Sequence, residues 1–157
     1  MYADAREFFE AVRSASMDLE RIRRELESME ERATALGGGG FDPRVRSTPA
    51  HDRMGNAVAA LVDRETKLRA QQDDHYALID RACALLYGTD NDLGLRVSFG
   101  WPADALYHHY LALRTWDETA RILGYSASHV RNMSKAALDY VDAHGEEYTK
   151  LGIGFAT

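Results

Sequence analysis

The stretch from Thr115 to Val141, TWDETARILGYSASHVRNMSKAALDYV, has the pattern of two helices joined by a tight turn. Thr115 and Glu118 have the spacing of a capping box, in which each side chain accepts a hydrogen bond from the backbone N–H of the other residue. Gly124 stands where a helix commonly ends in a left-handed residue, and Ser126 can cap the next helix. The sequence therefore predicts a helix-turn-helix, a motif whose second helix enters the major groove of DNA.

The second helix of this pattern, residues 126–143, has two opposed faces. At about 100° per residue its apolar residues cluster on one side: Val130, Met133, Ala137 and Val141. Its polar residues lie almost opposite: Ser128, Arg131, Asn132 and Lys135. Arg and Lys can bind phosphates or guanine, and Asn can pair with adenine. Together with the capping box and the turn, this strip favours a DNA-reading helix over the alternative, a solvated outer face. We predict DNA contacts from Thr115, Ser126, Ser128, His129, Arg131, Asn132 and Lys135.

The same segment resembles the C-terminal promoter-reading domain of bacterial sigma factors. The residues that carry the resemblance are Thr115, Glu118, Ala120, Leu123, Gly124, Ser126, Val130, Arg131 and the run Ala136–Leu138. More broadly, residues 52–145 resemble small phage and prophage proteins of Gram-positive bacteria, several of which are regarded as transcription regulators. Sigma factors carry an Arg-Glu pair early in the reading helix, where this chain has Ala127 and Ser128. The resemblance therefore implies a sigma-like regulator without the promoter preference of sigma factors.

Apolar residues recur in steps of three and four near the N-terminus: Ala5, Phe8, Val12, Ala15, Leu19, Ile22, Leu26, Met29, Ala33 and Leu36. This heptad seam predicts a helix about 48 Å long, which needs a partner to cover its apolar side. Gly37–Gly40 should end it, and Thr48-Pro49 should begin a second long helix. The apolar seam expected on that helix, interrupted by Glu65 and Gln72, consists of Met54, Val58, Leu61, Leu68, Tyr76, Ile79, Cys83 and Leu86.

The two long helices are of similar length and are joined by a Gly-rich loop at 37–47. We therefore predict an antiparallel helical hairpin, or coiled coil, and expect two such hairpins to associate into a homodimer. The alternative is a parallel homodimeric coil of the first helix alone, which would leave the apolar side of the second helix uncovered.

The remaining segments complete an all-α prediction. Residues 88–100 read as a loop that holds a short turn or an extended pair, and a supporting helix should run from Pro102 to Leu113. The expected domains are a hairpin region at 1–100, a trihelical helix-turn-helix domain at 101–145 and a flexible tail at 146–157.

The charge of the chain is unusual for a DNA-binding protein. Its formal net charge is −6 and its pI is about 5.5, whereas nucleic-acid-binding domains are often strongly basic. We therefore expect weak non-specific affinity for DNA, because phosphate contacts supply most of that term. The sequence shows neither a signal peptide nor a membrane span, and its single cysteine, Cys83, fits a reducing compartment, so a cytoplasmic location is expected.

No pattern of catalytic or metal-binding residues emerges. The six histidines form no HExxH motif and no Cys-His zinc spacing, so we expect no metal and no cofactor. Gly37–Gly40 lacks the Lys-Ser/Thr and the preceding strand of a phosphate-binding loop. The prediction is therefore that the protein is not an enzyme.

Three functions compete on this evidence from the residues. The first is a DNA-binding transcription regulator of phage or prophage type that binds double-stranded DNA, with RNA polymerase as a further candidate partner. The second is a DNA-packaging component similar to a small terminase subunit, which would assemble into a ring. The third is a protein-interaction adaptor with little DNA affinity, which the acidic balance favours.

Overall fold

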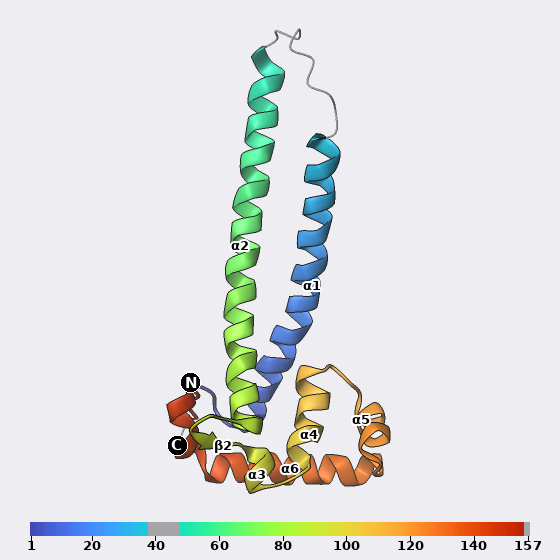
Figure 1. The fold of residues 1–157 in the computed structure, drawn as a ribbon, viewed down its shortest axis with the longest axis vertical. Coiled ribbons are helices and arrows are strands. Elements are labelled where there is room, and N and C mark those ends of the chain that lie inside the picture. The colour runs from blue at the N-terminus through green and yellow to red at the C-terminus, as the bar shows by residue number, and fades with distance from the viewer. Residues whose placement is uncertain (38–47, 156–157) are drawn as a thin grey trace. The chain divides into compact units, whose positions relative to one another are not determined.

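The computed structural model describes residues 1–37 and 48–155, and the chain there is mainly helical, which confirms the all-α prediction (Figure 1). Two long helices come first, α1 (Ala5–Gly37) and α2 (Thr48–Tyr87). The elements that follow are β1 (Gly88–Thr89), β2 (Asp92–Leu93), α3 (Leu95–Ser98), α4 (Pro102–Leu106), the π-helical turn η1 (Tyr107–Leu111), α5 (Trp116–Leu123), α6 (Ala127–Ala143), α7 (Gly145–Tyr148) and the 3-10 turn η2 (Thr149–Leu151).

The chain divides into two compact units. The first, here called the terminal unit, joins residues 1–18 to residues 75–157, and the second, the hairpin unit, spans residues 19–74. The boundary expected at residues 100 and 101 differs from this division. The physical reason for the difference is that the first turns of α1 and the last turns of α2 share a core with the helix-turn-helix.

The hairpin unit is held by a short apolar seam between α1 and α2. Ile22 and Leu26 of α1 bury their side chains with Leu68 of α2, and Met29 packs against them. An ion pair joins the same two helices, with Arg64 Nε 2.8 Å from Glu25 Oε1. These contacts show the predicted antiparallel hairpin, because residues later in α1 meet residues earlier in α2. The Gly-rich loop expected at 37–47 lies largely outside the described residues.

Two residues of the seam expected on α2 face solvent instead. Val58 is 50% exposed and Tyr76 is 51% exposed, whereas Leu68 is fully buried. The reason is helical geometry. Val58 is ten residues before Leu68 and Tyr76 is eight residues after it, so at about 100° per residue both side chains lie about 80° around the helix from Leu68. Met54 has no described side chain.

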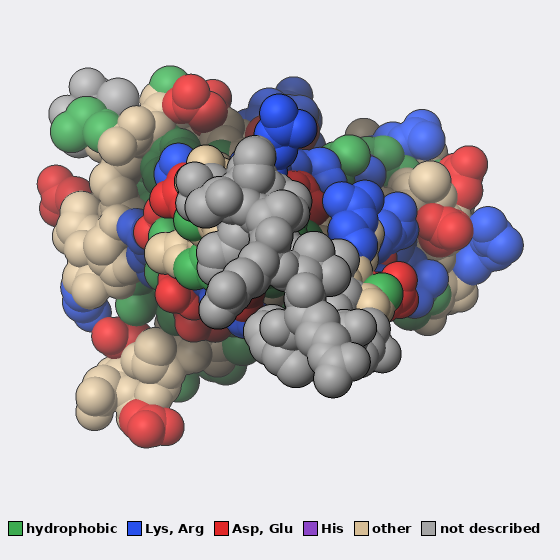
Figure 2. Space-filling model, turned by 90° about the horizontal axis from the view of Figure 1, so that it is seen from above, with side chains coloured by type: hydrophobic (Ala, Val, Ile, Leu, Met, Phe, Trp, Pro, Cys, Tyr) green, Lys and Arg blue, Asp and Glu red, His purple; other side chains and the backbone are tan. Residues whose placement is uncertain are grey.

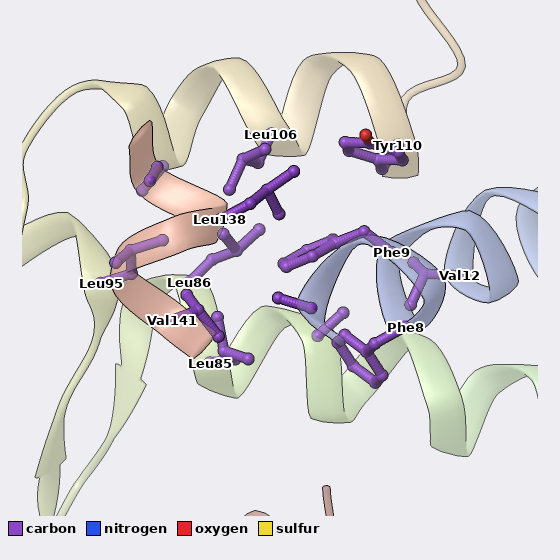
Figure 3. Packing of buried hydrophobic residues seen from close by; sticks show 14 of the residues in the cluster. Phe8, Phe9, Val12, Leu85, Leu86, Leu95, Leu106, Tyr110, Leu138 and Val141 are labelled. Carbon is purple, nitrogen blue, oxygen red and sulfur yellow. The ribbon is translucent and has the colours of Figure 1, made fainter. Parts of the chain in front are cut away.

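The terminal unit surrounds the larger of the apolar cores, drawn in Figure 3. Its fully buried members include Phe8, Phe9, Val12, Leu85, Leu86, Leu95, Leu106 and Val141, which come from α1, α2, α3, α4 and α6. Phe8 and Phe9 meet edge to face, with ring centroids 5.2 Å apart. Val141, on the apolar side of α6, belongs to this shared core. The rear half of α6 is therefore fixed by the two long helices.

The segment expected to be a flexible tail, 146–157, is folded as far as residue 155. Tyr148 and Ile153 are buried in the core of the terminal unit, and Tyr2 forms a parallel bridge with Phe155. The backbone N–H of Tyr2 donates to the carbonyl of Gly154 at 2.8 Å. The prediction of a flexible tail was wrong because Tyr148 and Ile153 return to the core and Phe155 packs against it.

The segments before the helix-turn-helix are close to expectation. β1 and β2 form the predicted extended pair, antiparallel and two residues long. The supporting helix ends earlier than Leu113, because α4 passes into the π-helical turn at Tyr107 and Leu113 has a positive φ of 59°. In the described part of the chain no helix combines the length and the apolarity that crossing a bilayer requires.

Candidate nucleic-acid interface

The first helix of the motif, α5, begins with the capping box that the sequence predicts. The backbone N–H of Glu118 donates to Thr115 Oγ1 at 3.2 Å, and the N–H of Thr115 donates to Glu118 Oε2 at 2.8 Å. The Thr115 hydroxyl also donates to Glu118 Oε2, at 3.1 Å, and the hydrogen bonds that the carboxylate accepts from the Thr115 N–H and hydroxyl hold the pKa of the Glu118 carboxyl below its usual value. The Thr115 side chain therefore stabilises the start of α5.

The turn between α5 and α6 also follows the prediction. Gly124 adopts a left-handed conformation with φ 76°, and its N–H donates to the carbonyl of Ala120 at 2.9 Å. A side chain at this position would strain the backbone, which explains the glycine. Ser126 then caps α6, because its Oγ accepts from the N–H of His129 at 3.2 Å.

A small apolar cluster fixes how α5 and α6 cross. Ala105 of α4, Ala120 of α5 and Val130 of α6 are buried together, with Trp116 and Leu123 partly buried against them. Two alanines let the three helices approach closely. Val130 is fully buried, whereas Trp116, Leu123 and Met133 are half-buried. The cluster presents the opposite face of α6 to solvent.

That solvent face carries the predicted polar strip. Ser128, Arg131, Asn132 and Lys135 are all exposed on α6. The Arg131 guanidinium lies beside the first turn of α5, with Nη2 3.8 Å from Asp117 Oδ1. The structure thus brings together on one exposed helix face two cations, an amide and a hydroxyl. This is the set of side chains that could contact base edges and phosphates in a major groove.

His129 differs from the other predicted contacts because it packs against two aromatic rings. Its ring centroid lies 5.6 Å from that of Trp101 and 5.4 Å from that of Tyr125. Trp101 and Tyr125 stack on each other at 4.4 Å with an angle of 20° between the rings. At about 100° per residue, His129 lies roughly 160° around α6 from Arg131. The sequence reasoning missed Trp101 and Tyr125, although an aromatic residue inside the Gly-Tyr-Ser turn was a usable signal.

The unit that carries the strip is acidic overall. The terminal unit has nine Lys and Arg residues and fourteen Asp and Glu residues, a formal net charge of −5. One of the acids, Asp142 at the end of α6, accepts a hydrogen bond from the backbone N–H of Ala5 at 2.6 Å. Asp142 thereby satisfies an otherwise unpaired N–H in the first turn of α1. This acid has a structural role, which accounts for its place on a candidate DNA-reading helix.

Among the described residues, no three His, Cys, Asp or Glu side chains are grouped as metal ligands would be. Burial, and then the nearby Asp80, raises the pKa of the Cys83 thiol, which disfavours the reactive thiolate. His109 stacks on Trp116 at 3.7 Å, and burial lowers the pKa of its imidazole.

Comparison with known proteins adds no relative. No protein-family model, curated protein or solved structure matches this chain.

Proposed function

We propose that this protein is a sequence-specific, double-stranded-DNA-binding transcription regulator of phage or prophage type, with a sigma-like helix-turn-helix. The observation that carries the proposal is the exposed strip of Ser128, Arg131, Asn132 and Lys135 on a helix that is capped, packed and joined to α5 by a left-handed glycine. In this motif the second helix lies in the major groove while the first crosses the DNA backbone.

Each side chain of the strip has a distinct expected role. Arg131 can bind a guanine through its forked N–H groups, and Asn132 can pair with the edge of an adenine. Lys135, one turn further along α6, suits a phosphate. Thr115 and Ser126 cap α5 and α6, so their contribution to DNA contacts would come from the lone pairs and backbone groups that capping leaves available.

The acidic balance of the terminal unit limits the affinity of a single copy. A net charge of −5 opposes the approach of the DNA backbone, and only a few cations lie on or near the strip. Two copies bound to two half-sites would supply twice the phosphate contacts. We therefore include a homodimer in the proposal.

Features of the hairpin unit support the proposed homodimer. Its α2 helix exposes Val58 and Val62 by 50% and 57%, beside a groove of about 280 Å³ whose lining includes Met29, Ala33 and Leu61. The unit has ten Lys and Arg residues against eleven Asp and Glu residues, so it would not repel its own copy. Figure 2, a view from above, shows Lys and Arg side chains near Asp and Glu side chains. The exposed valines of α2 and the small net charge of the hairpin unit fit a surface that pairs with a second hairpin.

The proposal is tested by selecting bound sequences from a random DNA pool and titrating the selected site with the protein and its variants. Arg131→Ala and Asn132→Ala should each weaken specific binding by about 1–3 kcal/mol if they read bases. Lys135→Ala should weaken binding to all sequences. It should also reduce the slope of the logarithm of the binding constant against the logarithm of the salt concentration by about one unit. Lys67→Ala, which removes the same charge from the hairpin unit, is the matched control and should change neither.

The alternatives give different results in the same set of measurements. Absence of DNA binding by the folded protein at low salt would contradict the proposal and favour the protein-interaction adaptor, which the charge of −5 supports. A ring of many subunits in native mass spectrometry would favour the packaging role. RNA polymerase, the further candidate partner, is tested by co-purification with the DNA-bound protein.

A further inference from the structure

The side chain at the centre of the polar strip is linked to the first helix of the motif. Arg131 Nη2 lies 3.8 Å from Asp117 Oδ1, and the two side chains are 56% and 73% exposed. Asp117 is the second residue of α5, in the turn where the first helix of such a motif approaches the DNA backbone. A carboxylate there is an unusual neighbour for a phosphate, because the two negative charges repel.

The fold does not require Asp117 at this position. Thr115 and Glu118 already satisfy the start of α5 through the capping box. An acid in the first turn also interacts favourably with the helix dipole, but Glu118 supplies that charge as well. The Asp117 carboxylate is therefore available to act on the residue it faces, Arg131.

We propose that Asp117 is a specificity-determining residue that positions Arg131 toward a guanine in the major groove. The inference rests on the proposed function, since it assigns a role within the same DNA-binding surface. The guanidinium has five N–H donors in a planar fork. A carboxylate at one edge leaves the other edge for the O6 and N7 acceptors of guanine, which require a fixed bidentate geometry.

The Asp117 carboxylate also disfavours a contact between Arg131 and a DNA phosphate. A distance of 3.8 Å is too long for a hydrogen bond, and solvent screens the pair in the free protein. When DNA excludes water from the groove, the attraction between the two groups strengthens. A phosphate placed at Arg131 would then lie near Asp117 and be repelled by it. Asp117 thus lowers affinity for arbitrary DNA while favouring a base contact, which raises the ratio between specific and non-specific binding.

The test compares two substitutions that each remove one negative charge near the DNA surface. Asp117→Asn removes the partner of Arg131, and Asp139→Asn removes an exposed acid further along α6. Both should bind random-sequence DNA as tightly as the parent or several-fold more tightly, because repulsion of phosphates is reduced. Only Asp117→Asn should change base preference.

The readout is binding to the selected site and to copies in which each guanine is replaced in turn. The parent should prefer one guanine by about tenfold or more. Asp117→Asn should reduce that preference to a few-fold, and Arg131→Lys, which keeps the charge but loses the fork, should reduce it similarly. In an Arg131→Ala background, Asp117→Asn should have no further effect on base preference. Circular dichroism melting curves confirm that each variant is folded.

The possible failures separate the inference from the proposed function. If the parent binds a selected site and Asp117→Asn keeps its full guanine preference, the positioning role is overturned while DNA reading stands. A selected site without any guanine whose replacement weakens binding overturns the inference in the same way. If the folded parent binds no DNA at low salt, both the proposed function and the inference are overturned.

Discussion

The terminal unit and the hairpin unit are both built on α1 and α2, yet they bury very different amounts of apolar surface. In the terminal unit Phe8 and Phe9 of α1 are fully buried in a core shared by several helices. In the described part of the hairpin unit the buried apolar cluster consists of Ile22, Leu26 and Leu68. Two helices alone have only one side each to bury, whereas the added helices of the terminal unit cover the remaining sides.

The two units also differ in net charge. The terminal unit has a net charge of −5, and its core buries Ala137, Leu138 and Val141 of α6. The hairpin unit is nearly neutral, with exposed valines on α2. In the proposed function, the terminal unit holds the helix that contacts DNA, and the hairpin unit supplies the contact between two copies.

The largest expected effect is loss of the fold in the terminal unit. Val130 is fully buried between Ala105 and Ala120, so Val130→Asp places an unpaired charge in an apolar cluster. The destabilisation should exceed about 3 kcal/mol. Circular dichroism and thermal melting should show a large loss of helix and of the cooperative transition. A variant that melts like the parent would contradict the register given for α6.

The matched change in the hairpin unit should leave the fold intact and remove the dimer. Val62 is 57% exposed, so Val62→Asp introduces a charge that remains hydrated in the monomer. If the outer side of α2 contacts a second copy, the same charge would be buried there without a partner and dimerisation should weaken by about tenfold or more. Analytical ultracentrifugation over a range of concentrations measures this shift. Unchanged association would move the dimer contact to another surface.

Much of this architecture could be predicted from the sequence because its signals are local. The capping box at Thr115, the left-handed glycine at 124 and the cap at Ser126 each depend on residues within one turn of helix, and each is present. The helix α1 was also predictable from its heptad seam, of which Ile22 and Leu26 are buried and Ala33 is exposed.

Long-range contacts explain the features that the sequence did not predict. The return of Tyr148 and Ile153 to the core depends on residues far apart in the chain, and no local pattern distinguishes it from a loose tail. The same holds for the Asp142 cap on the start of α1, which joins residues 137 positions apart. The pair of Asp117 and Arg131 required knowing how α5 and α6 cross, which only packing determines.

A smaller effect is expected from removing the cap of α5. Thr115→Ala removes the acceptor for the Glu118 N–H and half of the capping box. Loss of such a cap typically destabilises a protein by about 0.5–2 kcal/mol. Thermal or urea unfolding should show this loss, whereas Thr66→Ala, a change in the middle of α2 where the hydroxyl donates to the carbonyl of Val62, should have less effect. Equal effects would mean that the capping box contributes little to the terminal unit.

The smallest expected effect is a pH dependence that belongs to the same capping box. Hydrogen bonds from Thr115 lower the pKa of the folded-state Glu118 carboxyl below the ordinary value of 4.5. Because the folded pKa is depressed, the ionised carboxylate stabilises the fold above the unfolded pKa, and that stability is lost as the pH falls through the folded pKa. Glu118→Gln should therefore be slightly less stable than the parent near neutral pH, and the difference should shrink below about pH 4.5. Asp63→Asn, which removes an exposed acid paired with Lys67 in the hairpin unit, is the control for general charge effects. If the difference in stability between Glu118→Gln and the parent stays constant from neutral to acid pH, the loss comes from the shape of the amide. In that case the charge of the carboxylate does not stabilise the start of α5.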